Sequence, residues 1–308
     1  MKSKWALWRT FGVFAITAFV VFAATACRSL VGQEPQPESQ FVRVEGGTFL
    51  MGYCPTGESV TPMRNVTLSS FYISRFEVTQ GEWYDLMGTR PSWFTGATDS
   101  VGNPVMGVNW RNLPVERVNW YDAIVFSNRL SISRGRSPAY SISGSTNPDD
   151  WGPVPVPPVS NAPIWDAVEI VPGSNGYRLP TEAQWEFAAR GGTVCQGNFV
   201  FSGSNTAADV AWYGGNSGWR THEVGTRQPN ALGLYDMSGN VFEWVWDRLG
   251  PYPNVDETDP MGAPSGSTRM CRGGGWFDSG WGVRSANRDD INVPAYKGNY
   301  RGFRLVRP

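Results

Sequence analysis

Residues 233–244 read GLYDMSGNVFEW, and this stretch decides the fold that the sequence predicts. Phrases of the same kind, rich in Trp, Gly and Arg, recur on both sides of it. In chain order they are GTFLMG (47–52), EVTQGEW (77–83), PVERVNWYDA (114–123), YRLPTEAQWE (177–186), RGGGW (272–276), RSANR (284–288) and GFRL (302–305). Long amphipathic repeats are scarce, whereas Gly and Pro are abundant. We therefore expect an irregular, loop-rich fold that is held together by aromatic packing.

Local signals place the regular elements between these phrases. Apolar runs with glycine punctuation predict short strands within 46–52 and 66–74. Thr79 opens a capping box and starts a helix, Asn119 starts a second helix that stops at Gly135, and Thr181 starts a third over 182–190. Residues 147–172 are dense in Pro, which predicts an ordered insertion that runs over the surface.

Taken together, the eight phrases resemble the formylglycine-generating enzyme (sulfatase-modifying factor) superfamily across residues 41–308. The resemblance implies an α+β, C-type-lectin-like fold that is low in regular secondary structure. It also implies one large domain, which agrees with the length of the chain after its leader.

The resemblance does not extend to the chemistry of the enzymes. Those enzymes hold copper(I) with a pair of cysteines that follows the glycine-rich phrase near the C-terminus, and soft thiolates are the ligands that copper(I) requires. Here Cys271 precedes that phrase and no cysteine follows it. One histidine, His222, leaves too little for a histidine-based relay or an iron site. We expect a non-catalytic member, with the copper oxygenase, or another enzyme on the same scaffold, as the alternative.

The resemblance implies a structural calcium site and no other cofactor. In the family the matching positions supply two side-chain oxygens and two main-chain carbonyls, which here belong to Asp236, Gly239, Val241 and Glu243. The alternative is that Asp236 caps a turn and Glu243 pairs with an arginine.

The last part of the chain, residues 272–304, has the composition of a recognition surface. Trp276 and several of the residues that follow are aromatic, and they stand among Gly and Asp, where exposed loops are expected. Rigid aromatic side chains supply contact area at low entropic cost, and small polar ones adapt to a ligand. The candidate ligand-binding residues are Phe277, Asp278, Ser279, Trp281, Gly282, Asp289, Asp290, Ile291, Asn292, Tyr296, Asn299 and Tyr300.

This segment also resembles the variable region of the treponeme variable proteins, which a retroelement diversifies at template adenines. Such mutagenesis of Asn-type codons mainly yields residue types found at most of these positions, with Trp281 as the exception. A fixed surface loop of an invariant member is the alternative.

The N-terminus has the pattern of a lipoprotein signal. A basic start with Lys2 and Lys4 precedes an apolar stretch, which ends in small residues at Cys27. Lipid on Cys27 would anchor the chain, and residues 27–40 would form a flexible tether after a 1–26 signal peptide. Ala24 stands where the usual pattern has Leu, so an ordinary cleaved signal and an uncleaved anchor stay open.

Composition sets the expected partners. The formal net charge of −1 gives no reason to expect nucleic acid. We expect a monomeric lipoprotein on the outer membrane of a bacterium, exposed at the surface, which binds a protein or glycan ligand of another cell. An envelope scaffolding protein with a permanent neighbour is the remaining alternative.

Overall fold

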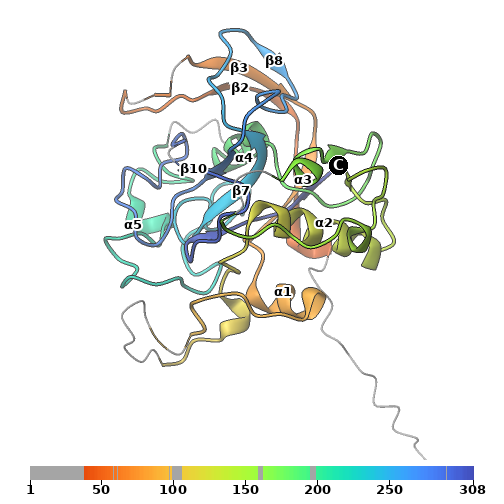
Figure 1. Ribbon diagram of the computed structural model, residues 1–308. Helices are drawn as coiled ribbons and strands as arrows, with labels where there is room; N and C mark the ends of the chain where they lie inside the picture. The colour runs from red at the N-terminus through yellow and green to blue at the C-terminus, as the bar shows by residue number, and fades with distance from the viewer. Residues whose placement is uncertain are drawn as a thin grey trace, which may run out of the picture. The chain divides into compact units, whose positions relative to one another are not determined.

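Short elements joined by long loops make up this protein, as the computed structural model shows (Figure 1). The structure describes residues 38–308 except 58, 61, 97, 99–105, 159–161, 195–198 and 289, and it describes residues 38 and 290–292 by their backbone alone. The predicted signal peptide, Cys27 and most of the tether lie outside the described residues. The part of the chain that the structure describes belongs to one compact unit.

The helices are few and short. The α-helices are α1 (Gln80–Met87), α2 (Trp120–Ser133), α3 (Pro163–Asp166), α4 (Glu182–Ala189) and α5 (Ala207–Val210). Single 3-10 turns are η1 (Glu38–Gln40), η2 (Trp110–Asn112) and η3 (Pro148–Asp150). Among the described residues, no helix is long and apolar enough to cross a membrane.

The three predicted helix starts are confirmed. Each of Thr79, Asn119 and Thr181 accepts a hydrogen bond from the main chain three residues on, and the side chain at that position bonds back to it. These capping boxes satisfy donors that a helix leaves without partners at its first turn. The sequence therefore locates α1, α2 and α4 from local chemistry alone.

The strands form small sheets. They are β1 (Phe41–Val44), β2 (Gly47–Met51), β3 (Arg64–Leu68), β4 (Phe71–Ser74), β5 (Tyr140–Ser141), β6 (Glu169–Ile170), β7 (Phe242–Arg248), β8 (Glu257–Thr258), β9 (Arg269–Arg272), β10 (Asp290–Asn292), β11 (Arg301–Gly302) and β12 (Val306–Arg307). The described sheets have the orders β10-β9-β7-β11, β1-β4-β12, β2-β3-β8 and β5-β6.

The apolar run 66–74, predicted as strand, is divided between two sheets. β3 pairs with β2, whereas β4 pairs with β1 and β12. The chain changes sheet at two serines, where Asp259 accepts hydrogen bonds from the main chain and side chain of Ser69, and Gly46 donates to the Ser70 hydroxyl. These long-range contacts leave no trace in the local pattern.

The Pro-rich segment 147–172 contains short elements and contributes to the core. Trp151 and Trp165 are buried, and their rings meet edge to face at 5.8 Å. Trp165 also contacts Tyr121 of α2 at 5.5 Å. Two buried tryptophans of this segment therefore pack into the domain interior, whereas the sequence predicted an excursion over the surface.

Two tryptophans connect α2 to the central strand β7. Trp120 donates its indole N–H to the carbonyl of Val245, and Trp244 donates to the carbonyl of Val118. Both rings are fully buried, so each indole N–H needs such an acceptor. The pair fixes the helix on the sheet from both sides.

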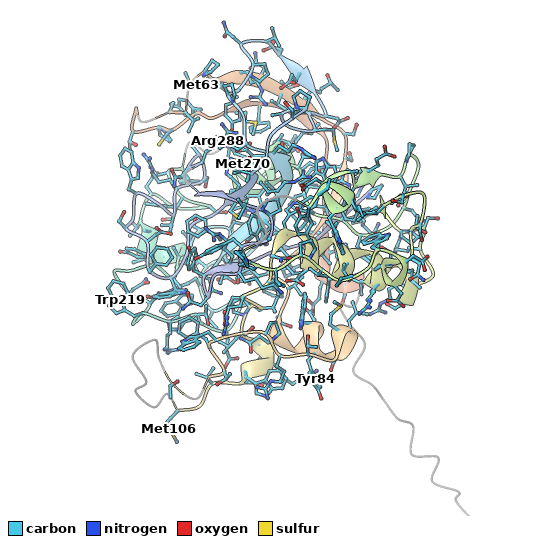
Figure 2. All side chains as sticks on the ribbon, in the orientation of Figure 1. Met63, Tyr84, Met106, Trp219, Met270 and Arg288 are labelled. Atoms are coloured by element: carbon cyan, nitrogen blue, oxygen red, sulfur yellow. The ribbon has the colours of Figure 1, made fainter. Side chains whose placement is uncertain are left out.

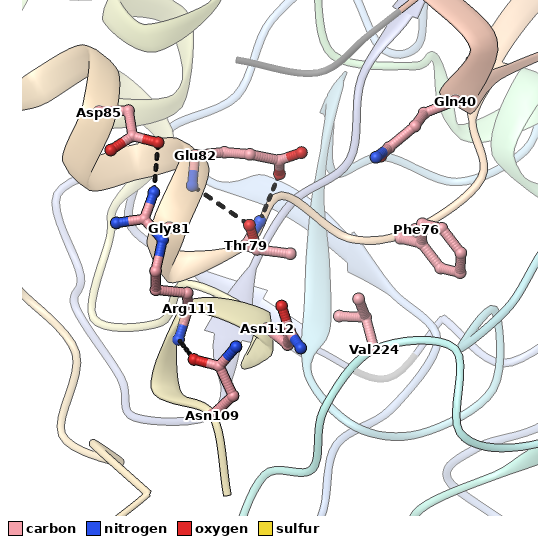
Figure 3. A pocket seen from close by; sticks show the side chains of 10 residues that line it. All are labelled: Gln40, Phe76, Thr79, Gly81, Glu82, Asp85, Asn109, Arg111, Asn112 and Val224. Atoms are coloured by element: carbon pink, nitrogen blue, oxygen red, sulfur yellow. Dashed lines mark hydrogen bonds and ion pairs between the residues drawn. The ribbon is translucent and has the colours of Figure 1, made fainter. Parts of the chain in front are cut away.

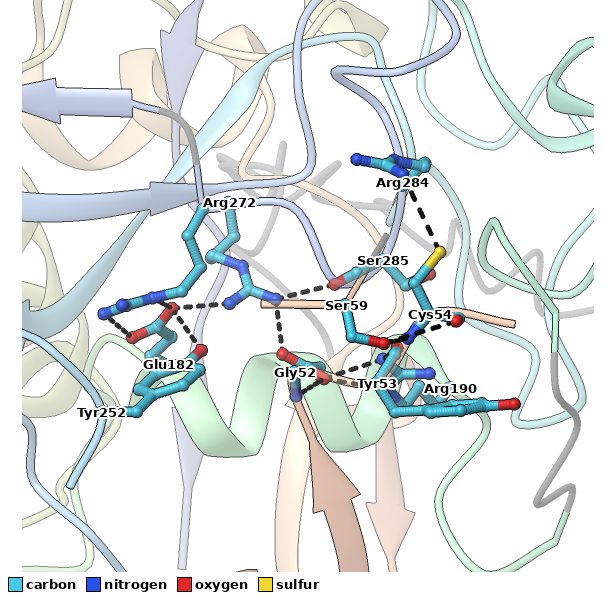
Figure 4. A network of polar contacts seen from close by, with 12 residues as sticks. Gly52, Tyr53, Cys54, Ser59, Glu182, Arg190, Tyr252, Arg272, Arg284 and Ser285 are labelled. Atoms are coloured by element: carbon cyan, nitrogen blue, oxygen red, sulfur yellow. Dashed lines mark hydrogen bonds and ion pairs between the residues drawn. The ribbon is translucent and has the colours of Figure 1, made fainter. Parts of the chain in front are cut away.

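Buried ion pairs surround α4 (Figure 4). Arg272 of β9 reaches Glu182 at 2.6 Å and Glu186 at 2.8 Å, and Arg288 bonds to Glu182 at 2.6 Å. Burial opposes ionisation of both carboxylates. Nevertheless, Arg288 and Arg272 lower the pKa of Glu182, and Arg190 and Arg272 lower the pKa of Glu186. The network joins α4, β9 and the 284–288 segment in one charged cluster.

Replacing Arg272 with Met should lower the free energy of unfolding by about 3 kcal/mol or more, because two buried carboxylates lose a shared partner. Urea unfolding followed by tryptophan fluorescence measures the change. Arg43→Met is the control, because Arg43 pairs with Glu45 in solvent and its loss should cost less than about 1 kcal/mol. Equal effects of the two substitutions would contradict a structural role for the network.

Candidate functional site

Aromatic side chains of the 272–304 segment form a continuous run of ring contacts, defined here as the aromatic face. Trp276 meets Phe277 at 5.3 Å between ring centroids, Phe277 meets Tyr300 at 4.8 Å, and Tyr300 meets Tyr296 at 6.4 Å. Most of these pairs are edge-to-face or tilted, the arrangements that aromatic quadrupoles favour. Three of the predicted binding residues therefore lie together.

The members of the aromatic face differ in exposure. Trp276 is only 7% exposed, so the expectation that it lies on an exposed loop is wrong: its indole N–H donates to the Asn299 carbonyl and its ring packs against Phe94. Phe277 and Tyr300 are half-buried against the core. They can present one edge to a ligand while the other stabilises the fold.

Main-chain contacts hold the first loop of the segment. Trp276 N–H donates to the Asn240 carbonyl at 2.8 Å, the Ser217 hydroxyl donates to the Trp276 carbonyl at 2.6 Å, and Gly214 N–H donates to the Asp278 carbonyl at 2.8 Å. Within the loop, the Asp278 carboxylate accepts from Gly275 N–H at 2.7 Å. Apart from Asp278, no candidate binding side chain is needed for these bonds.

The second loop, 293–300, is held in the same way. Trp120 N–H donates to the Pro294 carbonyl, Arg117 N–H to the Gly298 carbonyl, and Phe242 N–H to the Tyr300 carbonyl, at 2.8–3.0 Å. All three donors lie outside the candidate set. The backbone of both loops is thus positioned independently of most side chains that they present.

The remaining predicted residues lie in different surroundings. Ser279 is exposed and Asn299 is half-buried. Trp281 is 50% exposed, and the Arg284 guanidinium lies over its ring at 3.4 Å. Gly282 is buried, and a Cβ there would lie 3.0 Å from the Asp278 side chain, so it shapes the loop. Asp289 lies outside the described residues, and Asp290, Ile291 and Asn292 form β10, whose backbone pairs with β9.

Two exposed tryptophans were not in the predicted set. Trp219 is 57% exposed and meets Trp276 at 6.2 Å, and Figure 2 shows it at the periphery of the molecule. Trp93 is 56% exposed, beside the Phe94 that packs under Trp276. Most tryptophans inside the family phrases are buried in the core. Trp93 and Trp219 lie outside those phrases, and this was the sequence signal that could have marked them as exposed.

Glu116 is a buried residue that holds Phe94, which packs against Trp276 of the aromatic face. Its carboxylate is fully buried and accepts a hydrogen bond from Phe94 N–H at 2.8 Å. Burial raises the pKa of Glu116 to about 8. Because Phe94 packs on Trp276, the hydrogen bond that Phe94 N–H donates to Glu116 helps to position Trp276 in the aromatic face.

His222 is a packed residue. Its ring stacks on Trp212 at 3.6 Å, and Nε2 lies 2.7 Å from the Ser217 carbonyl. Burial lowers the pKa of His222 to about 4, so the ring is neutral at physiological pH. The histidine therefore supports the 217–219 loop beside Trp276.

The predicted calcium residues lie in a buried carboxylate cluster. Glu243 accepts two hydrogen bonds from Arg304 at 2.6 Å and one from the Trp185 indole at 2.7 Å. Asp236 accepts from Gly225 N–H, whereas its Oδ1 has no hydrogen-bond partner in the described part of the chain. The arginine pairing considered for Glu243 is thus present.

Among the described residues, no group of three or more Asp, Glu, His or Cys side chains is placed to hold a metal ion. Glu77, Asp236 and Glu243 share one arginine, and burial raises the pKa of Asp236 to about 6 and that of Glu77 well above its ordinary value. Glu243, however, is already occupied by Arg304. The calcium site stays a prediction, and a melting temperature that calcium chelation leaves unchanged would remove it.

A polar pocket of about 470 Å³ lies away from the aromatic face (Figure 3). Two of its walls are fixed by the Arg111–Asp85 ion pair and by the capping box of Thr79 and Glu82. Its lining residues are Gln40, Phe76, Thr79, Gly81, Glu82, Asp85, Asn109, Arg111, Asn112 and Val224. None of the predicted site residues is among them.

Residues 27–308 match the sequence profile of a protein family, the sulfatase-modifying factor enzyme 1-like domain. The chain belongs to this family. A similar family member is the formylglycine-generating enzyme of Bos taurus, which is 28% identical over 319 residues that cover 92% of this chain and 78% of that protein. The α+β, C-type-lectin-like fold of the formylglycine-generating type is confirmed.

Two further proteins are more similar to this chain in sequence. Treponema denticola variable protein 1 is 37% identical, with a TM-score of 0.76, over 87% of this chain and 95% of that structure. Chaperone protein LppX of Paenibacillus barcinonensis is 37% identical over 323 residues, which cover 97% of this chain and 98% of that protein. The predicted resemblance to the variable proteins is confirmed.

The pKa of Glu116 leads to a prediction for pH dependence. Its pKa in the folded state lies above that in the unfolded chain, near 4.3, so its contribution to stability is complete below about pH 4. That contribution is lost as the pH rises through about 8. Between pH 6 and 8, Glu116 should lower the free energy of unfolding by about 1 kcal/mol per pH unit.

Glu116→Gln should remove this part of the slope, as urea unfolding at several pH values would show. The difference between wild type and variant isolates Glu116 from Asp236 and Asp247, whose raised pKa values lie in or near the same range. Parallel pH profiles would contradict the prediction.

Proposed function

We propose that this chain is a non-catalytic binding protein, held at a bacterial membrane by lipid on Cys27, which presents residues 272–304 to a protein or glycan of another cell. It acts as a monomer, and its binding surface is the aromatic face with Asp278, Asn299 and the exposed Trp219 at its border. No bond is made or broken in the ligand.

The main-chain anchoring of the two loops carries this proposal. Most hydrogen bonds that position 276–278 and 293–300 come from main-chain groups and from side chains outside the candidate set, those of Ser217, Asn119 and Trp276. The Asp278 carboxylate is the exception. Side chains on such loops can change while the backbone stays in place. Diversification of a binding surface requires that the residues which hold the backbone differ from the residues which contact the ligand.

Similarity and composition support the same proposal. The chain resembles a treponeme variable protein at 37% identity over most of both structures. No cysteine follows the glycine-rich phrase 272–276, where the copper-binding pair of the oxygenases is expected. Copper(I) retained at one equivalent through dialysis would favour the oxygenase instead.

The position on the membrane follows from the N-terminal segment. A basic start, an apolar stretch and small residues before Cys27 form the signal, and residues 28–40 are polar enough to act as a tether. We propose that the lipid inserts in the outer membrane and that the domain faces outward.

A folding helper of the envelope is the second candidate, because the similarity to Chaperone protein LppX extends over 97% of this chain. A helper would suppress the aggregation of an unfolded secreted protein at equimolar concentration. A display protein would leave the aggregation unchanged.

Sequencing the 3′ part of the gene in many separately grown clones tests the proposal. We expect substitutions confined to the twelve candidate positions and traceable to template adenines, with the anchoring residues Ser217, Asn240 and Gly214 unchanged. An invariant segment would contradict diversification, and changes spread evenly over 272–304 would contradict the division between residues that hold the backbone and residues that contact the ligand.

A further inference from the structure

A second pocket lies beside the buried ion network, where none of the candidate binding residues is found. Its volume is about 330 Å³, and it is lined by Arg64, Arg248 and Arg288 together with Tyr252 and the prolines 251, 253 and 264. Three carboxyl groups, those of Glu182, Asp247 and Glu257, also line it, so the wall combines charged groups of both signs with an apolar surface. That combination suits a small molecule with one charged end.

The Arg64 guanidinium has a buried donor without a partner, and the Arg248 guanidinium is only half-buried. Arg64 is 6% exposed and pairs with Glu257 at 2.9 Å, but its Nη1 has no hydrogen-bond partner in the described residues. Arg248 donates from Nη2 to the Asp166 carbonyl at 2.8 Å. Arg288, by contrast, is occupied by Glu182. A buried donor without an acceptor is costly, and an anionic ligand would remove that cost.

The pocket is rigid on the side of these arginines. The Tyr252 ring has the Arg64 guanidinium at 4.1 Å and the Arg288 guanidinium at 3.9 Å, and its hydroxyl donates to Glu182. Arg288 also donates to the Gly250 carbonyl at 3.1 Å. Because these side chains are already ordered, a ligand would lose little affinity to their immobilisation.

The charge of the pocket favours an anion near neutral pH. Glu182 is neutralised by Arg288 and Arg272, and Glu257 pairs with Arg64. The remaining carboxyl group, Asp247, is buried and lies close to Glu182, and together these raise its pKa to about 7. With this raised pKa, Asp247 offsets the arginines of the pocket less at neutral pH than an ordinary carboxylate would.

We propose that this pocket binds a small organic carboxylate, with its carboxylate group at Arg64 and Arg248 and its short apolar tail against the prolines and Tyr252. The planar guanidinium fork matches a carboxylate. The site is independent of the aromatic face and of the proposed display function.

Isothermal titration of the full chain in detergent with sodium propionate tests the proposal, with inorganic phosphate as the competing probe. We expect one propionate per chain and weaker binding of phosphate. Arg248→Gln should reduce the propionate affinity about tenfold or more without changing the melting temperature, because Arg248 is only half-buried. Arg64→Gln should do the same where it folds.

Arg129→Gln is the matched control, because Arg129 pairs with Asp149 on another surface and should leave propionate binding unchanged. Absence of propionate binding to the wild type, or binding that Arg248→Gln leaves intact, would overturn the site. Tighter binding of phosphate than of propionate would overturn the carboxylate class.

Discussion

The rest of the structure depends on the pairing of buried arginines with buried carboxylates. Arg272 and Arg304 are fully buried, as are Glu186 and Glu243, and Glu182 is nearly so. Burying any one of these charges without a partner would cost several kcal/mol of folding free energy, on the order given by model systems, so the cluster is stable only when all its members are present. Arg272 connects β9 to α4, and Arg304 connects the C-terminal loop to β7 and to the Ser74 carbonyl of β4. With little regular secondary structure available, these charged contacts specify how distant segments meet.

This framework explains how a loop-rich domain can keep a defined surface. The first loop of the aromatic face begins directly after Arg272, and the second ends just before Arg304. Both ends of the 272–304 segment are thus fixed by ion pairs, and its middle is held by main-chain hydrogen bonds. The side chains that face solvent take little part in either kind of support.

Local chemistry made part of the structure predictable. Thr79, Asn119 and Thr181 start helices because their side chains satisfy nearby main-chain donors, and this requires no knowledge of distant residues. The change of sheet at Ser69 depends on Asp259, nearly two hundred residues away, and could not be found in this way.

The candidate binding site was likewise predictable only in part from the sequence. Composition placed Phe277, Tyr296 and Tyr300 in one aromatic group, and their rings are in contact in the structure. The burial of Trp276 could not be predicted in this way, because it depends on Phe94 and Asn299. Glu116 and Trp219 were missed because a single carboxylate or tryptophan has no distinctive pattern around it.

The sheet β1-β4-β12 joins the two ends of the domain. Ile73 of β4 pairs with Val42 on one side and with Val306 on the other, so these ends lie about 10 Å apart. The final strand is synthesised after the whole 272–304 segment, and Arg304 is the last residue of that segment. A frameshift or premature stop codon within that segment therefore removes both, leaving Glu243 buried without its arginine and β4 with one unpaired edge. Under the diversification proposed above, only in-frame products that retain Arg304 and β12 would complete the domain.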